Sequence, residues 1–106
     1  MSGEEKNLRL LFDTDALEEY RRLEKTHRKI FRKKLRKLAT RREYPSPKNA
    51  LHGFPRGYYK IKLRKAGMRL VYRYDDNELV ILVIAVGRRE RNTVYEVARA
   101  RMERKL

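Results

Sequence analysis

Lysine and arginine recur at every second position of one segment, which is the spacing of side chains on a single face of a β-strand. The cations are Lys60, Lys62 and Arg64, and apolar residues separate them. Such a row could hold the phosphates of a polyanion. A lysine among other cations also has a lowered pKa, because neighbouring positive charge disfavours its charged form. The spacing therefore indicates chemistry on a phosphodiester, provided that other elements bring further cations to the same face.

The next segment, residues 68–74, also alternates and predicts an antiparallel hairpin with residues 59–64, turning at Gly67. Directly opposed residues of an antiparallel pair share a face. The register that buries the apolar residues then places Arg69 and Arg73 beside the first three cations. A slip by one residue would put cations in the core, so the register is well determined.

A third segment, residues 79–86, is apolar at both its odd and its even positions, so we expect a central strand that is covered on both faces. It ends at Gly87 and leads into a loop that carries three arginines, namely Arg88, Arg89 and Arg91. Tyr95 falls in the first turn of the predicted last helix. Cations from three segments on one face of a sheet predict a phosphate-handling cleft.

The elements that position these residues follow from periodicity. Asn7–Phe12 reads as a first strand. Asp13 or Asp15 can cap a helix after it, with Glu18 and Glu19 in its first turn, where the helix dipole favours negative charge. A second helical stretch follows, with Thr26 as a possible cap and an apolar face at Ile30, Phe31, Leu35 and Leu38. We expect these two stretches to form a helical hairpin, because it is more compact than one long helix.

The prolines all lie between Pro45 and Pro55, so Tyr44–Gly57 is expected to be an ordered loop. Thr93 and Glu96 fit a capping box at the start of the last helix. The element order is then β-α-α-β-β-β-α. The fold class is a small α+β domain with a mainly antiparallel sheet and a helical hairpin on one face.

Composition limits the partners. The chain has 106 residues with 29 Lys+Arg and 14 Asp+Glu, a net charge of +15, and we expect residues 1–106 to form one domain. Two stretches, 25–42 and 44–74, hold no acid, which favours a polyanion such as nucleic acid. No apolar run is long enough for a membrane span and the N-terminus lacks a signal-peptide core, so a cytoplasmic protein without a membrane partner is expected. With no cysteine and two histidines, we expect no metal and no cofactor.

The second predicted helix has a strongly basic face. It carries Arg28, Lys29, Arg32, Lys33, Arg36 and Lys37. We expect this face to dock on RNA phosphates, which gives affinity without sequence recognition. The alternative is a solvated face that contacts nothing.

Five segments give the chain a family resemblance: YKIKLR at 59–64, GMRLVY at 67–72, VGRRER at 86–91, VY at 94–95 and LHG at 51–53. Together, in their order along the chain and at compatible spacing, they resemble the RelE toxin family from about Leu8 to Arg101. The resemblance implies a toxin of a type II toxin–antitoxin pair that enters the ribosomal A site and cuts the mRNA codon there. It also implies an acidic, partly disordered RelB-like antitoxin that folds on this basic surface.

The resemblance carries over residue by residue. The family's functional positions match Lys60, Lys62, Arg64, Arg69, Arg89, Arg91 and Tyr95. Arg88 stands where the family often has lysine. Cleavage by the 2′-hydroxyl group needs a base, a group for the leaving oxygen and cations on the phosphorane. Our hypothesis gives Lys62, with Lys60, the proton transfer.

The other roles in this hypothesis belong to two arginines and a tyrosine. Arg69 stabilises the transition state, Arg89 stabilises or protonates the leaving oxygen, and Tyr95 stacks on or orients a base. Two alternatives stay open from the sequence. One is a ParE-like gyrase poison without nuclease activity, and the other is a non-catalytic nucleic-acid-binding module.

Overall fold

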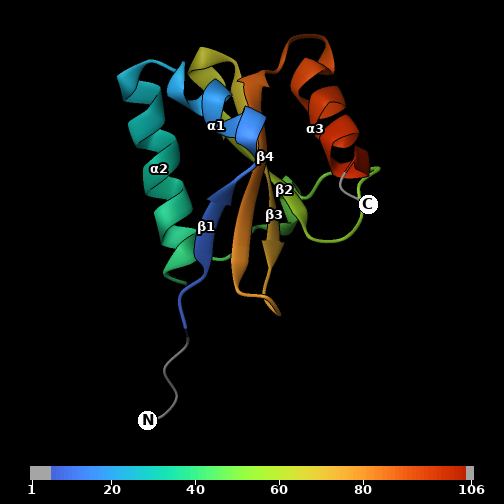
Figure 1. Ribbon diagram of the computed structural model, residues 1–106. Helices are drawn as coiled ribbons and strands as arrows, with labels where there is room; N and C mark the ends of the chain where they lie inside the picture. The colour runs from blue at the N-terminus through green and yellow to red at the C-terminus, as the bar shows by residue number, and fades with distance from the viewer. Residues whose placement is uncertain (1–5, 105–106) are drawn as a thin grey trace.

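The computed structural model describes residues 6–104, and its elements follow the predicted order β-α-α-β-β-β-α (Figure 1). The helices and strands are β1 (Arg9–Phe12), α1 (Thr14–Arg21), α2 (Lys25–Ala39), β2 (Tyr58–Leu63), β3 (Met68–Asp75), β4 (Val80–Arg88) and α3 (Thr93–Arg104). Three short 3₁₀ turns lie between them, at Pro47–Asn49, Arg64–Ala66 and Glu90–Asn92. None of the helices in this part of the chain has the length and apolar character needed to cross a bilayer.

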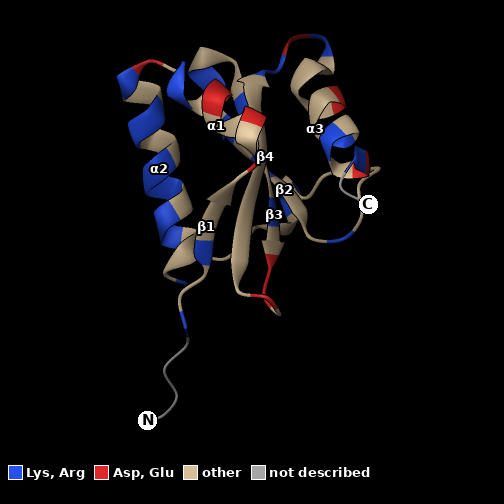
Figure 2. Ribbon diagram, viewed as in Figure 1, with Lys and Arg blue, Asp and Glu red and all other residues tan. Residues whose placement is uncertain are grey.

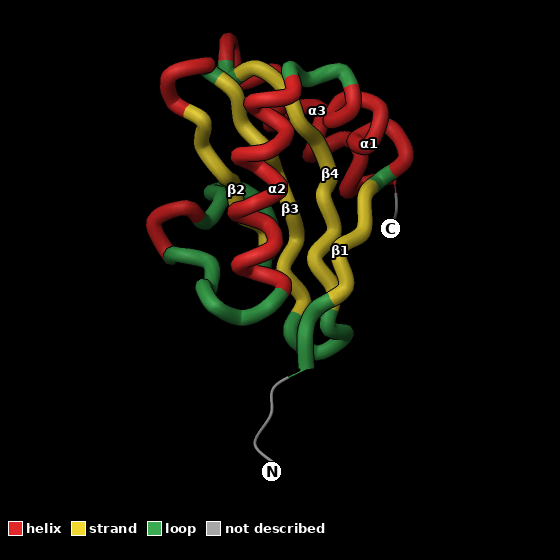
Figure 3. The backbone as a smooth tube through the Cα atoms, turned by 90° about the vertical axis from the view of Figure 1, so that its left-hand side faces the viewer, coloured by secondary structure: helices red, strands yellow, loops and turns green. Residues whose placement is uncertain are grey.

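The four strands form one sheet in the order β1-β4-β3-β2 (Figure 3). β1 pairs with β4 in parallel, and the other two pairs are antiparallel. The mainly antiparallel α+β class predicted from the sequence is therefore confirmed. β4 lies between β1 and β3, as its two-sided apolar pattern predicts.

The sheet separates two apolar cores. On one face α1 and α2 pack as a helical hairpin over the sheet, and the fully buried Phe31, Leu35 and Leu70 lie in this core. On the other face α3 packs over β3 and β4 through Val94 and Ala98. Figure 1 shows α2 and α3 on opposite sides of the strands. Side chains of β2 and β3 that point away from the first core must therefore point toward the side of α3.

Helix capping agrees with the prediction only in part. The carboxylate of Asp13 accepts the backbone N–H groups of Asp15 and Ala16 at 2.9 and 3.2 Å, so Asp13 caps α1. The predicted cap at Thr26 is wrong, because the helical bonding of α2 already starts with the carbonyl of Glu24.

The predicted capping box of the last helix is also wrong. Thr93 lies inside α3, with helical φ and ψ of −58° and −44°. Its hydroxyl group donates to the carbonyl of Glu90 at 2.9 Å, because the preceding 3₁₀ turn brings that carbonyl close.

The loop between α2 and β2 is ordered, as predicted, and it partly covers the outer edge of β2. Ala50 forms a bridge with Tyr59, and the Leu51 N–H donates to the Tyr58 carbonyl at 3.0 Å. Within residues 6–104, no strand pairs with the outer edge of β2 beyond this bridge. The edge next to Lys60–Leu63 therefore faces the loop residues 44–49 and α2.

Candidate active site

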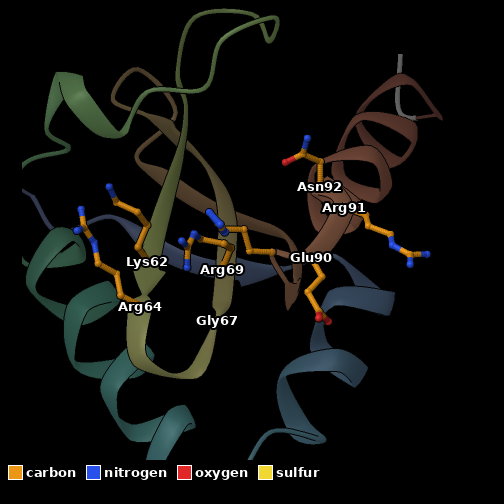
Figure 4. Close-up of a pocket in the computed structure, with 8 residues that line it drawn as sticks. Lys62, Arg64, Gly67, Arg69, Glu90, Arg91 and Asn92 are labelled. Atoms are coloured by element: carbon orange, nitrogen blue, oxygen red, sulfur yellow. The ribbon is translucent and has the colours of Figure 1, made fainter.

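A cleft of about 810 Å³ opens where the β2–β3 turn meets the loop after β4 (Figure 4). Its walls come from the three segments whose cations are predicted to share one face of the sheet. The lining residues are Lys62, Arg64, Gly67, Arg69, Arg89, Glu90, Arg91 and Asn92. Five of these eight are cationic, so the cleft is suited to an anion.

The hairpin register places the first pair of cations. Lys62 is directly opposite Arg69 in the β2–β3 pair, as predicted. On its other side Arg69 is opposite Gly87 of β4, which has no side chain to occupy the same face. Arg69 is only 7% exposed, and one of its guanidinium N–H groups donates to the Met68 carbonyl at 2.8 Å. A buried, hydrogen-bonded guanidinium is fixed in position before any substrate binds.

The loop after β4 is tied to the turn of the hairpin. Gly67 adopts a left-handed φ of 65°, and its carbonyl accepts the Arg89 N–H at 2.9 Å. Arg91 and Asn92 also have left-handed φ values, 55° and 57°, which are uncommon for residues with a side chain. In Figure 4 the Arg91 side chain extends away from Lys62. The loop therefore brings Arg89 to the cleft and leaves Arg91 at its rim.

Lys62 has a lowered pKa, which is the direction expected from its neighbours. The positive charge of Arg64 is the largest cause, followed by partial desolvation and the charges of Lys60 and Arg69. Lys48, in the 3₁₀ turn at Pro47–Asn49, adds to the same effect. Sequence reasoning did not connect Lys48 with Lys62, on which it acts from outside the lining of the cleft. Its place in an acid-free loop next to the cationic strand is the signal that could have selected it.

Lys60 and Tyr95 lie together beside the cleft rather than in it. The Lys60 Nζ atom is 5.9 Å from the centroid of the Tyr95 ring, within range of a cation–π contact. Tyr95 lines a separate hollow of about 630 Å³ with Leu51, His52, Phe54, Asn92, Glu96 and Arg99. Asn92 lines both hollows. The five predicted catalytic residues thus form two adjoining groups on the α3 side of the sheet.

Two arginines that the sequence grouped with the cleft lie elsewhere. Arg73 forms ion pairs with Asp75 at 2.7 Å and Glu78 at 3.8 Å, at the other end of β3. Arg88 is opposite Met68, which packs into the core under α1 and α2, so Arg88 belongs to the opposite face from Arg69. Successive positions of β4 face opposite sides of the sheet, so Arg88 points away from the face that Gly87 shares with Arg69. Arg88 therefore does not join the cleft, contrary to the prediction.

Figure 2 shows Lys and Arg residues along α2. These cations divide into structural and exposed ones. Arg28 donates to the Arg21 carbonyl at 3.1 Å and also to the Leu23 carbonyl, so it fastens the α1–α2 connection. Lys37 pairs with Glu43 at 3.8 Å. The other four predicted docking residues are exposed, namely Lys29, Arg32, Lys33 and Arg36. These four form the surface for which docking stays a prediction.

The fold and cleft together define a class: a small basic α+β domain whose cations converge on one cleft. Residues 10–93 match the protein family described as "ParE toxin of type II toxin–antitoxin system, parDE". A RelE-like toxin protein of Escherichia coli is 47% identical over 91 residues, covering 86% of this chain and 93% of the relative. The mRNA interferase toxin RelE of E. coli strain K12 is 46% identical over 90 residues, covering 82% of this chain and 88% of that toxin.

The chain belongs to the RelE/ParE family of toxins of type II toxin–antitoxin systems. Solved structures agree with this assignment. A double arginine mutant of E. coli RelE in the free state matches with a TM-score of 0.78 and 41% identity, covering 91% of this chain and 98% of that one. RelE in the E. coli RelBE toxin–antitoxin complex matches with a TM-score of 0.70 and 43% identity, covering 79% of this chain and 99% of that one.

Proposed function

We propose that the chain is a ribosome-dependent mRNA endoribonuclease that stops translation by cutting the codon in the A site. The observation that carries this proposal is the placement of Lys62, with its lowered pKa, directly opposite the buried Arg69 in a cationic cleft. The relatives named mRNA interferase support it.

In the proposed reaction the 2′-oxygen of one nucleotide attacks the adjacent phosphorus. The proton of the 2′-hydroxyl group passes to neutral Lys62, a new P–O2′ bond forms, and the bond from phosphorus to the 5′-oxygen of the next nucleotide breaks. The leaving 5′-oxygen receives a proton from Arg89 or from water, so the products are a 2′,3′-cyclic phosphate and a 5′-hydroxyl end. Both bonds that change at phosphorus lie within the RNA, and the chain supplies proton transfer and positive charge.

The remaining residues stabilise and orient. Arg69 is pre-positioned to stabilise the negative charge that develops on the phosphorane, which is the most effective use of a fixed cation. Arg89, held against the hairpin turn through its backbone, stabilises or protonates the leaving oxygen. Lys60 assists Lys62 and lies over Tyr95, which orients a base by stacking. Arg64 and Arg91 bind flanking phosphates at the rim.

The ribosome is the partner that presents the substrate. The mRNA fixed in the A site supplies the in-line geometry, and the cleft supplies positive charge and proton transfer. The exposed cations of α2 dock on ribosomal RNA phosphates. Because translation is the target, we place the chain in the cytoplasm. An acidic antitoxin resembling the RelB partner of E. coli RelE neutralises the basic surface.

The gyrase-poison reading is less well supported. The matching family description carries the ParE name, but the relatives at 46% identity are named mRNA interferases. A gyrase poison also gives no reason for a lysine with a lowered pKa beside a buried arginine. The same cluster disfavours a module that only binds nucleic acid.

Primer extension on mRNA in a reconstituted translation reaction tests the proposal. Wild type should cut within A-site codons only when ribosomes are present, and Arg89→Ala should lower the cleavage rate by roughly 100-fold or more. Arg88→Ala is the matched control, since it removes the same charge one residue away on the opposite face. Intact mRNA with wild type would contradict the proposal, and a gyrase cleavage assay would then test the ParE reading.

A further inference from the structure

A second, smaller groove of about 280 Å³ lies along the outer edge of β2. It is bounded by α2, by the loop after α2 and by β2 itself. Its lining includes Lys34, Tyr44, Ser46, Asn49, Lys62 and Arg64. We call it the edge groove. Its volume is close to the lower limit of roughly 300 Å³ for small-molecule pockets, which suits one nucleotide rather than a longer ligand.

The edge groove is continuous with the cleft. Lys62 and Arg64 line both. In Figure 4 these two side chains extend from β2 and from the 3₁₀ turn that follows it, on the side of the cleft farthest from Arg91. A polymer whose phosphate lies at Lys62 therefore has its next residue within reach of the groove.

The groove carries an exposed aromatic side chain. Tyr44 is 54% exposed, and Leu11 on β1 is the other large apolar side chain that is exposed within residues 6–104. The Tyr44 hydroxyl group interacts with Arg41. Arg41 is itself held by Asp76 at 2.7 Å and by the Lys6 carbonyl at 2.8 Å. The phenol is therefore anchored at one end while its ring stays accessible, as a base-stacking platform requires.

The polar groups of the groove fit a nucleotide. Lys34 and Arg64 supply positive charge, and Ser46 and Asn49 offer donors and acceptors that can meet a base edge or a ribose. Glu43 also lines the groove, and its carboxylate pairs with Lys37 3.8 Å away. The apolar Leu38, Ile61 and Tyr72 line it as well. This mixture of cations, an aromatic ring and amide groups is typical of sites for single-stranded nucleic acid.

We propose that the edge groove binds the nucleotide next to the scissile phosphate, with its base stacked on Tyr44 and its phosphate held by Lys34 and Arg64. This inference rests on the proposed function, because it assigns a subsite of the same RNA. It makes Tyr44 a substrate-binding residue and Lys34 a phosphate contact.

A double perturbation tests the stacking directly. Programmed ribosomes are prepared with normal mRNA and with mRNA that has an abasic nucleotide on either side of the cleavage position. Wild type, Tyr44→Ala and Tyr44→Phe are compared by kcat/KM for cleavage. Tyr44→Ala and the abasic nucleotide at one flanking position should each lower kcat/KM by roughly 5- to 150-fold, the range that stacking of one base supplies. Tyr44→Phe should stay within about 3-fold of wild type.

The two losses should not add. If Tyr44 stacks on that base, Tyr44→Ala combined with the abasic mRNA should lose no more than either change alone, because both remove the same contact. Leu11→Ala is the control for trimming an exposed apolar side chain, and circular dichroism verifies that each variant is folded. The subsite would be overturned if the losses from Tyr44→Ala and from the abasic nucleotide multiplied at both flanking positions. It would also be overturned if Tyr44→Ala were as active as wild type. The proposed function would stand in either case. Absence of cleavage by wild type would overturn both.

Discussion

Glu19 of α1 and Arg101 of α3 lie 82 positions apart in the chain and form a two-point ion pair, with N–O distances of 2.9 and 2.8 Å. The same Glu19 carboxylate accepts the Val86 N–H at 3.0 Å, and Arg101 donates to the Ile84 carbonyl at 2.9 Å. The pairing of β3 with β4 is irregular here, because Ile84 is skipped between Val83 and Ala85. The pair therefore fastens both helices to the strand that ends at the cleft.

This relationship predicts a large loss of stability in Glu19→Ala. The substitution leaves the Val86 N–H and the Arg101 guanidinium without their carboxylate partner. We expect the free energy of unfolding to fall by about 2 to 3 kcal/mol. Urea denaturation in an Arg89→Ala background would measure it, because that background should spare the host from the toxin.

Glu18→Ala is the matched control. Glu18 is the adjacent residue, its side chain is 61% exposed, and its contact with Arg22 is a loose 3.8 Å. Exposed pairs of this kind contribute little, so the change should stay within about 0.5 kcal/mol. Equal effects of the two substitutions would show that the Glu19–Arg101 pair does not hold the helices to β4.

The exposed cations of α2 should control ribosome affinity through counterion release. Lys33→Gln with Arg36→Gln should weaken binding and reduce the slope of log affinity against log salt by roughly 1 to 2, since each phosphate contact contributes about 0.7 to 0.9. Filter binding to ribosomes over a salt series measures the slope. Arg9→Gln with Arg104→Gln removes the same charge elsewhere and should leave the slope unchanged. If both double variants reduced the salt slope equally, net charge rather than this face of α2 would set the affinity for ribosomes.

The sequence predicts the hairpin half of the site better than the rest. Alternation determines which residues of β2 share a face, and burial determines the register, so Lys62 opposite Arg69 follows from local pattern. The prediction that Glu18 and Glu19 lie in the first turn of the helix is wrong, because α1 begins at Thr14 and the acidic residue in its first turn is Asp15. Glu19 lies further along α1, and its partner Arg101 comes from a distant segment. Lys48 and Tyr44 belong to a loop without periodicity, so only the folded chain brings them to β2. Arg73 has an acid two positions along, and that local pair removes it from the cleft.

Tyr95 should act through its ring rather than its hydroxyl group. Lys60 lies over the ring, and the proposed contact with RNA is also a stacking contact. Tyr95→Phe should therefore keep the single-turnover cleavage rate within about 3-fold, whereas Tyr95→Ala should lose roughly 5- to 150-fold. Rapid-quench cleavage on programmed ribosomes would separate the two. If Tyr95→Phe loses as much as Tyr95→Ala, the phenol itself takes part in proton transfer.

The pH dependence of cleavage should report the pKa of Lys62. As a base Lys62 must be neutral, so the single-turnover rate should rise with pH and level off above its pKa. Because neighbouring cations lower that pKa, the plateau should begin at a lower pH than an isolated lysine would give. Arg64 is the largest cause, so Arg64→Gln should raise the pKa and move the rising limb to higher pH. The rate at neutral pH should then fall about tenfold for each pH unit by which the limb moves.

Lys65→Gln is the control for this experiment, because it removes one charge next to Arg64 without being among the causes that lower the Lys62 pKa. It should leave the position of the limb unchanged. Arg64 also contacts the proposed substrate, so the rate is measured at saturating toxin. The midpoint of the pH profile, rather than its height, then reports the pKa of the base. A midpoint that stays fixed in Arg64→Gln, or a rate that falls as pH rises, would assign the base to another group. Lys62→Ala should remove the limb altogether, since no titrating base would remain at that position.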